Sequence, residues 1–248
     1  MRYLILSDIH SNLEALEAVL RAASAQKYDQ VLVLGDLVGY GADPNAVCDR
    51  IRALEPLMSV RGNHDKVAAG LDNPGDFNPM AKTAANWTRQ ALKKDTLDFL
   101  RSLPAGPRDV DGVVEICHGS PLDEDQYVVS DLDMLRSLGV SERPVCLFGH
   151  THVATCGSLD RKQQLELSTP QGHPEFEISI DPETKYLINP GSVGQPRDGD
   201  PRAAYAIADT TARCVELFRL SYSVEHTQSK IIAAGLPEVL AQRLGMGR

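Results

Sequence analysis

Histidine, aspartate and asparagine gather in short polar clusters that could together bind metal ions. The clusters are Asp8-Ile9-His10, Gly35-Asp36, Gly62-Asn63-His64-Asp65, His118-Gly119 and Gly149-His150-Thr151-His152. Imidazole nitrogens combined with carboxylate and amide oxygens form a mixed ligand set that suits borderline divalent metals such as Mn, Fe, Zn or Ni. The clusters supply more such ligands than one ion normally takes from a protein, so the pattern indicates two metal ions that share one carboxylate.

Each cluster directly follows a short apolar stretch that we expect to be a β-strand. The first 65 residues read as strands over 3–6, 31–34 and 57–60 that alternate with helices over 13–22 and 44–53, the second helix capped by Asp43. Such alternation favours neighbouring parallel strands, whose ligands bind at the carboxyl ends. On an extended chain, Asp8 and His10 would point to one face, and so would His150 and His152.

The remaining elements predict a layered α/β fold. Helices are expected over 80–103 with a break near 94–95, over 131–138 with Gly139 as the stop, and over about 223–246. Two further strands are expected over 113–117 and 145–148. A second, mostly antiparallel set of strands is expected over 165–167, 176–180, 186–188, 204–208 and 215–220. We therefore predict an αββα sandwich of two mixed sheets with helices on the outer faces. Residues 1–248 would form a single domain.

Composition limits the partners of this chain. A net charge of -9 and a pI near 5.2 argue against a protein that coats long nucleic acids. They do not exclude a small phosphorylated ligand, because bound metal ions can invert the local field. Five scattered cysteines without CxxC spacing, and the lack of a long apolar run or leader peptide, indicate a cytoplasmic protein without membrane contact. Nothing in the sequence separates a monomer from a dimer.

In their order and spacing, the clusters resemble the calcineurin-like metallophosphoesterases. The family pattern of DxH, GD, GNHD, H and GHTH is matched in full over residues 1–220 or so. Segments 35–41 and 189–197 are most similar to small bacterial members described as diadenosine-tetraphosphatase-like. The resemblance implies a two-metal phosphohydrolase, with Mn favoured, in which a metal-bridged hydroxide attacks a phosphodiester, phosphomonoester or phosphoanhydride of a small soluble substrate. A dinucleoside polyphosphate is the favoured substrate.

The same resemblance implies a role for each polar residue. One metal ion would bind Asp8, His10 and His152, the other would bind Asn63, His118 and His150, and Asp36 would bridge the two. His64 would protonate the leaving oxygen or stabilise its charge. Asp65 would orient His64 from behind, as carboxylates do for working histidines.

Three further residues are weaker candidates for substrate contacts. Asn12 could cap the helix that follows it or face a substrate phosphate. Arg197, in a loop rich in glycine and proline, could bind a phosphate or lie in solvent. Tyr40, between two glycines, could stack on a base or be an ordinary loop aromatic.

Two other functions fit parts of the pattern. A protein Ser/Thr phosphatase would carry Gly-Asp-x-x-Asp-Arg-Gly, whereas residues 35–41 read Gly-Asp-Leu-Val-Gly-Tyr-Gly. A catalytically silent scaffold that binds a protein partner would be expected to lose metal ligands, and the sequence retains the full set. Substrate choice would depend on the rim loops 71–79, 121–130 and 191–200.

Overall fold

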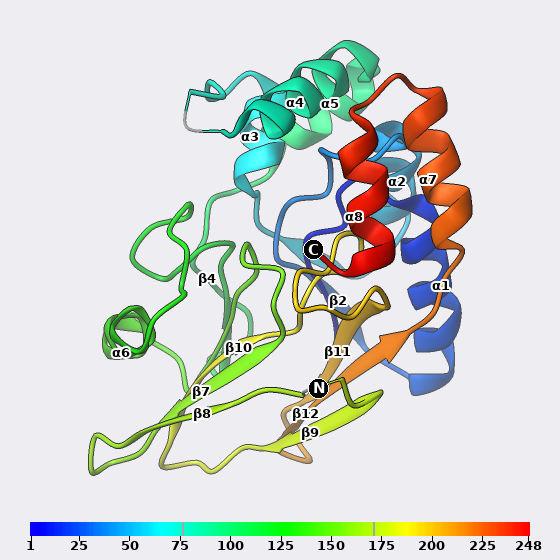
Figure 1. Cartoon of the computed structure of the whole chain (residues 1–248). Helices are drawn as coiled ribbons and strands as arrows, with labels where there is room; N and C mark the ends of the chain where they lie inside the picture. The colour runs from blue at the N-terminus through cyan, green and yellow to red at the C-terminus, as the bar shows by residue number, and fades with distance from the viewer. Residues whose placement is uncertain (76, 171) are drawn as a thin grey trace.

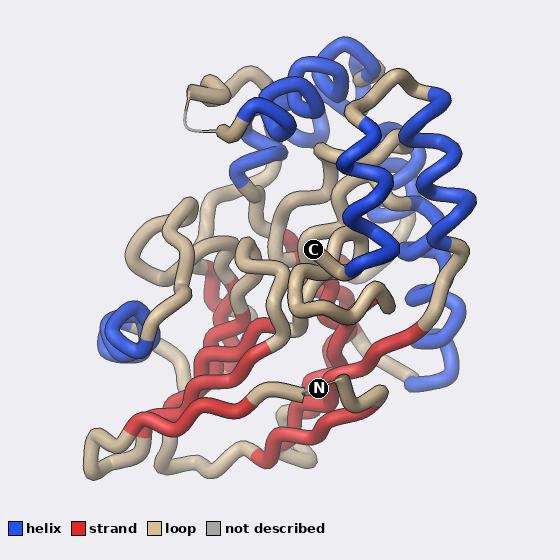
Figure 2. The backbone as a smooth tube through the Cα atoms, in the orientation of Figure 1, coloured by secondary structure: helices blue, strands red, loops and turns tan. Residues whose placement is uncertain are grey.

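The computed structural model describes all residues except 76 and 171 (Figure 1). Two six-stranded sheets form its centre (Figure 2). The first sheet has the order β3-β2-β1-β11-β12-β9 and consists of β1 (Arg2–Leu6), β2 (Gln30–Val33), β3 (Leu57–Ser59), β9 (Glu175–Ser179), β11 (Ala203–Asp209) and β12 (Cys214–Leu220). The second has the order β4-β5-β6-β10-β7-β8 and consists of β4 (Arg108–Asp109), β5 (Val114–Ile116), β6 (Val145–Leu147), β7 (Thr155–Leu159), β8 (Leu165–Ser168) and β10 (Lys185–Asn189).

The inner faces of the two sheets share one apolar core. Ile5 and Leu32 of the first sheet belong to the same buried cluster as Ile116, Leu147 and Ile188 of the second. Alternate residues of a strand point to opposite faces, so the next residues along, such as Leu4 and Leu6, pack outward against helices. This arrangement confirms the predicted sandwich of mixed sheets.

Helices cover both outer faces. Helices α1 (Leu13–Ala23), α2 (Pro44–Arg52) and α5 (Lys94–Ser102) share a buried cluster with the outer side of the first sheet, and α6 (Asp131–Val140) packs on the second. Figure 1 shows α6 and α1 on opposite sides of the sandwich. The remaining helices are α3 (Asn63–Ala69), α4 (Pro79–Ala91), α7 (Val224–Ala233) and α8 (Glu238–Met246), with a short 3₁₀ turn over Ser24–Gln26. None of the described helices has the length and apolar character needed to cross a bilayer.

Three predictions about the elements are wrong. The late strands do not form a set of their own but divide between both sheets, because β11 pairs with β1 and β10 lies parallel to β6. Gly139 does not end its helix, which continues to Val140 and closes with the bond from Ser141 N–H to Ser137 C=O. The Asp43 side chain does not cap α2, because its carboxylate accepts a hydrogen bond from Lys230 instead.

Candidate metal centre

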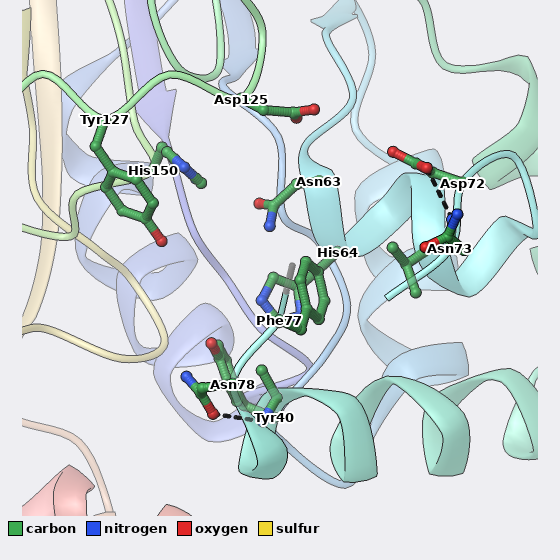
Figure 3. A pocket seen from close by; sticks show the side chains of 12 residues that line it. Tyr40, Asn63, His64, Asp72, Asn73, Phe77, Asn78, Asp125, Tyr127 and His150 are labelled. Carbon is green, nitrogen blue, oxygen red and sulfur yellow. Dashed lines mark hydrogen bonds between the residues drawn. The ribbon is translucent and has the colours of Figure 1, made fainter. Parts of the chain in front are cut away.

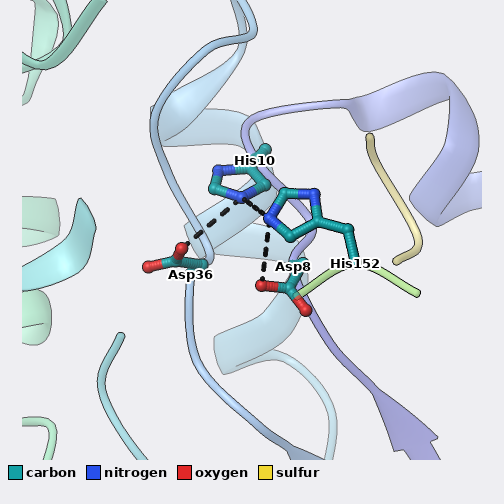
Figure 4. Close-up of side chains that lie close together, drawn as sticks. All are labelled: Asp8, His10, Asp36 and His152. Carbon is teal, nitrogen blue, oxygen red and sulfur yellow. Dashed lines mark hydrogen bonds and ion pairs between the residues drawn. The ribbon is translucent and has the colours of Figure 1, made fainter. Parts of the chain in front are cut away.

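The polar clusters meet where β1, β2, β3, β5 and β6 end. Two groups of buried side chains have ligand atoms within 4.8 Å of one another, namely Asp8, His10, Asp36 and His152, and Asp36, His118 and His150. Figure 4 shows the first group, in which contacts run from Asp36 to His10, from His10 to His152 and from His152 to Asp8. The side chain of Asp36 belongs to both groups. The order of the strands therefore brings six of the predicted ligands together, and the seventh, Asn63, lies beside His118.

At five of these residues the backbone is left-handed rather than extended. The φ angles are 52° at Asp8, 49° at His10, 53° at Asp36, 69° at His150 and 61° at His152. The extended geometry expected for the DxH and HTH segments is therefore wrong. Hydrogen bonds between neighbouring loops maintain the unfavourable backbone, including those from Asp8 N–H to Gly35 C=O and from His10 N–H to Asp36 C=O. Non-glycine residues at positive φ are uncommon and cluster at functional sites.

Backbone carbonyls fix the tautomers of three histidines. Nδ1 lies 3.0 Å from Val38 O in His10, 2.8 Å from Leu34 O in His118 and 2.6 Å from Gln195 O in His152. Because a carbonyl oxygen can only accept, each Nδ1 carries a hydrogen. In the neutral rings, each Nε2 therefore presents a lone pair to the centre of the site.

These lone pairs face other acceptors. Nε2 of His10 lies 3.1 Å from Nε2 of His152, which is itself 3.4 Å from Asp8 Oδ1. Asp36 Oδ2 lies 3.5 Å from Nε2 of both His10 and His118. Buried lone pairs that face one another without a hydrogen between them are unfavourable. Metal cations would accept these lone pairs, so the arrangement fits a metal-binding site.

The second group shows the same character. Nε2 of His118 lies 3.2 Å from Asn63 Oδ1. Nε2 of His150 is buried and has no hydrogen-bond partner among the described residues. A buried nitrogen left without a partner is costly, so it too fits a position beside a metal ion.

Charges inside the cluster are strongly coupled. Burial raises the pKa of Asp8 to about 6 and lowers the pKa values of His10 and His152 well below 6.5. Burial also opposes charge on His118, but the Asp36 carboxylate outweighs it and raises the pKa of His118 to about 10. A proton can therefore bind between His118 and Asp36, and a metal ion bound there would have to displace it.

His64 lies beside the cluster without joining it. Its ring centroid is 4.9 Å from that of His10, 4.4 Å from that of Tyr40 and 4.6 Å from that of Phe77. Its backbone N–H donates to Asp36 Oδ1 over 2.9 Å, which orients that carboxylate. Burial lowers the pKa of His64 to about 4, so the ring is neutral at pH 7.

The predicted support of His64 by Asp65 is wrong. The Asp65 carboxylate accepts hydrogen bonds from the backbone N–H groups of Val38, at 3.2 Å, and Gly62, at 3.0 Å. Nδ1 of His64 is buried without a hydrogen-bond partner in the part of the chain that the structure describes. Asp65 therefore holds the start of α3 and the loop after β2 together, while packing rather than a carboxylate positions the His64 ring.

Asn12 also departs from its suggested role in substrate binding. Its Oδ1 accepts from Ala15 N–H and from Thr227 Oγ1, and its Nδ2 donates to Gly194 C=O and to Tyr222 Oη. All the hydrogen-bonding capacity of the amide is used within the fold. Asn12 is a helix cap that joins α1 to the loop after β10 and to α7.

Tyr40 and Arg197 lie together beside the metal centre. The Tyr40 ring is centred 4.7 Å from that of His10, and the Arg197 guanidinium carbon lies 5.7 Å from the centre of the Tyr40 ring. Nη2 of Arg197 donates to Gln195 Oε1 over 3.0 Å. The structure thus brings both of these candidates to the site.

A cavity of about 300 Å³ opens next to His64 and His150 (Figure 3). Besides residues of the polar clusters, its lining includes Tyr40, Phe77 and Tyr127. The Tyr127 ring packs on that of His150, with centroids 3.8 Å apart. Sequence reasoning did not single out Phe77 or Tyr127. Each is the single aromatic residue of a predicted rim loop, 71–79 for Phe77 and 121–130 for Tyr127. That position was the feature of the sequence that could have indicated a contact with the substrate.

Comparison with known proteins agrees with this geometry. Residues 1–213 match the calcineurin-like phosphoesterase superfamily domain. The crystal structure of a metallophosphoesterase from Sphaerobacter thermophilus has a TM-score of 0.86 and 39% identity, covering 100% of this chain and 99% of its own. An uncharacterised protein of Methanocaldococcus jannaschii is 38% identical over 98% of this chain and 97% of its own, and the phosphodiesterase YfcE of Escherichia coli K12 is 23% identical over 84% and 88%. The chain belongs to the calcineurin-like phosphoesterase superfamily and is a metallophosphoesterase.

Proposed function

We propose that this protein is a two-metal phosphohydrolase that cleaves phosphodiester or phosphoanhydride bonds in small soluble substrates. Nucleotides and dinucleoside polyphosphates are the leading substrate candidates. The observation that carries the proposal is the position of Asp36 Oδ2, at 3.5 Å from Nε2 of both His10 and His118. A carboxylate oxygen that faces two groups of ligands suits a bridge between two ions. The name of the related phosphodiesterase YfcE supports a phosphodiester substrate.

The proposed ligand sets follow the two groups of side chains. Asp8, His10 and His152 would hold one ion, Asn63, His118 and His150 would hold the other, and Asp36 would contact both. Divalent ions at these positions would neutralise phosphate oxygens and lower the pKa of an attacking water. Nitrogen and oxygen donors together suit Mn, which we favour, as well as Fe, Zn and Ni.

The chain's own residues would bind and orient the ester. His64 lines the cavity beside the metal centre, where a neutral imidazole can donate one N–H to the leaving oxygen. The rings of Tyr40 and Phe77 hold its plane. The cavity itself would take the leaving group.

Turnover of bis(p-nitrophenyl) phosphate by protein loaded with Mn tests the proposal. We expect about two metal ions per chain and turnover that falls roughly 100-fold or more in His64→Ala, the size typical of losing one hydrogen-bond donor to the charge that develops in the transition state. His173→Ala, which removes an exposed histidine, is the matched control and should turn over like the wild type. The proposal would be overturned if the wild type turned over the diester no faster than His64→Ala with each of Mn, Fe, Zn and Ni.

A further inference from the structure

Two aromatic side chains lie against the histidines that line the cavity at the metal centre. The Phe77 ring is centred 4.6 Å from that of His64, and the Tyr127 ring is centred 3.8 Å from that of His150. Phe77 is half-buried, Tyr127 is 49% exposed, and both line the cavity of about 300 Å³ (Figure 3). Aromatic faces that are only partly covered suit a flat, apolar ring of a ligand.

Amide side chains add hydrogen-bond donors to the same lining. Asn73 and Asn78 both line the cavity. The Asn73 side-chain oxygen accepts from Gly75 N–H over 2.9 Å. The Asn78 side-chain oxygen accepts from the backbone N–H groups of Met80 and Ala81, each over 3.0 Å. Because both oxygens serve the backbone, these side chains would offer a ligand their N–H groups, which the nitrogens and oxygens of a nucleobase accept.

The charged side chains that line the cavity are acidic. Asp72 and Asp125 are among them, and no lysine or arginine in the described part of the chain lines it. Arg197 lies instead over the Tyr40 ring, 5.7 Å from the ring centre, and donates to Gln195 Oε1. The carboxylates would repel a negatively charged group in the cavity, which disfavours a second phosphoryl group there.

Two cations behind the lining neutralise most of its negative charge. Lys66 Nζ lies 2.5 Å from Asp125 Oδ2 and 3.8 Å from Asp72 Oδ2. It also lies 3.1 Å from Glu124 Oε1, and the Glu124 carboxylate accepts two hydrogen bonds from Arg61. Only one carboxylate is therefore in excess, so the cavity does not depend on a cationic ligand. Because Asp72 and Asp125 belong to the two aromatic-bearing rim loops, the same ion pairs hold both loops against α3.

We propose that this cavity binds an uncharged aromatic part of the substrate, such as the base of a nucleoside, against the Phe77 and Tyr127 rings. The inference rests on the proposed function, because the cavity receives the leaving group only if His64 donates to the leaving oxygen. The substrate would then be a phosphodiester of an uncharged nucleoside rather than a phosphoanhydride, whose leaving group carries further phosphoryl charge. Hydrolysis would form a bond from phosphorus to the oxygen of water and break the bond to the nucleoside oxygen, which takes a proton.

Binding of related phosphonates tests the cavity without a catalytic readout. Calorimetry on Mn-loaded protein would compare methylphosphonate with benzylphosphonates that carry a 4-carbamoyl, 4-carboxy or 4-aminomethyl group. We expect the uncharged carbamoyl compound to bind most tightly, by about tenfold over methylphosphonate, because its ring is buried on binding. Phe77→Leu and Tyr127→Leu should each weaken its binding about threefold to tenfold, the size of one lost contact between aromatic rings, and leave methylphosphonate unaffected.

Tyr28→Leu is the matched control, because Tyr28 is a half-buried aromatic outside the lining, and it should bind all four compounds like the wild type. The exposure of Tyr127 keeps its variant folded even if Phe77→Leu is unstable. Tighter binding of the carboxy or the aminomethyl compound than of the carbamoyl compound would overturn the proposal, as would unchanged affinities in both leucine variants. Failure of the proposed function is a separate result, seen as absent turnover of bis(p-nitrophenyl) phosphate by the wild type.

Discussion

Nε2 of His10 lies 3.1 Å from Nε2 of His152, and both rings direct Nδ1 at backbone carbonyls. In the neutral rings this contact brings two lone pairs together in a buried place. A divalent cation would turn the repulsion into coordination. Metal binding should therefore favour the folded chain over the unfolded chain, which lacks this arrangement of ligands.

Metal removal should lower the melting temperature. An ion present at about 100 times its Kd contributes about 2.7 kcal/mol per site, and about 1 kcal/mol shifts the melting temperature of a chain of this size by about 2–4 °C. EDTA would remove both proposed ions, so we expect it to lower the temperature by about 10–20 °C, measured by scanning calorimetry against Mn-loaded protein. His152→Ala, which removes a ligand of one of the two ions, should lose about half of the effect, whereas His173→Ala should keep it. Identical melting curves with EDTA and with Mn would contradict a metal centre at His10 and His152.

Replacing Asp36 by asparagine should remove the bridge between the two proposed metal ions. The carboxylate uses Oδ2 toward both His10 and His118, and it uses Oδ1 to accept the His64 N–H. An amide has only one oxygen and cannot serve all these positions. We expect Asp36→Asn to bind no more than about one ion per chain and to lose at least roughly 100-fold in turnover. Elemental analysis measures the metal content, and the diester assay measures turnover. Asp98→Asn, which changes an exposed aspartate, is the control. If Asp36→Asn kept two ions and normal turnover, Asp36 would not be the bridge.

The meeting of the polar clusters was predictable because parallel strands end at the same edge. The apolar stretches before Asp8, Asp36 and His150 are long enough to be recognised as strands, and the polar residues follow them directly. The backbone at these residues was not predictable. Its positive φ angles depend on hydrogen bonds between loops that are far apart in sequence, such as the bond from Ser11 N–H to Leu37 C=O.

The surroundings of His64 were missed for a related reason. Asp65 is adjacent to His64 in sequence, but α3 begins at Asn63 and turns the two side chains toward different neighbours. Periodicity does not reveal a seven-residue helix that starts inside a polar cluster. The contact of α8 with Tyr40 likewise joins segments about 200 residues apart, a contact that local patterns do not encode.

Alanine at Gly39 should disturb His64 while leaving the metal ligands in place. A Cβ on Gly39 would lie 2.5 Å from Nδ1 of His64, closer than any ordinary contact, and the φ of +95° adds backbone strain. We expect Gly39→Ala to keep its metal content and to lose turnover as the ring shifts. Gly112→Ala is the control, because Gly112 has a similar φ of +81° but nothing within 4 Å of an added Cβ.

The control should cost only the strain of a left-handed alanine, about 1–2 kcal/mol. Chemical denaturation reports that cost for both variants, and the diester assay reports turnover. If Gly39→Ala turns over its substrate as fast as Gly112→Ala does, contact with Gly39 does not position the His64 ring.

Lys230 fastens α7 to the N-terminal half of the chain through two carboxylates. Its Nζ lies 2.5 Å from Glu14 Oε1 and 2.9 Å from Asp43 Oδ2. Burial alone would raise the pKa of Glu14, but the hydrogen bond and charge of Lys230 lower it below 4.5. Because the folded-state pKa lies below the unfolded value, ionised Glu14 stabilises the fold above the unfolded pKa, and this contribution is lost as pH falls through the folded-state pKa.

Lys230→Met should therefore destabilise the protein near neutral pH and have little effect in acid. We expect its free energy of unfolding to be about 1 kcal/mol below that of the wild type at neutral pH, since the pair is largely shielded from solvent. The gap should narrow as the pH falls through the folded-state pKa of Glu14, below which the carboxyl is protonated in both states. Urea denaturation at several pH values measures it, and Lys94→Met, which breaks the exposed pair with Asp98, should change stability by less than about 0.5 kcal/mol. A gap of the same size at both pH values would mean that the Lys230 stem stabilises α7 by packing, without a contribution from the ionised Glu14.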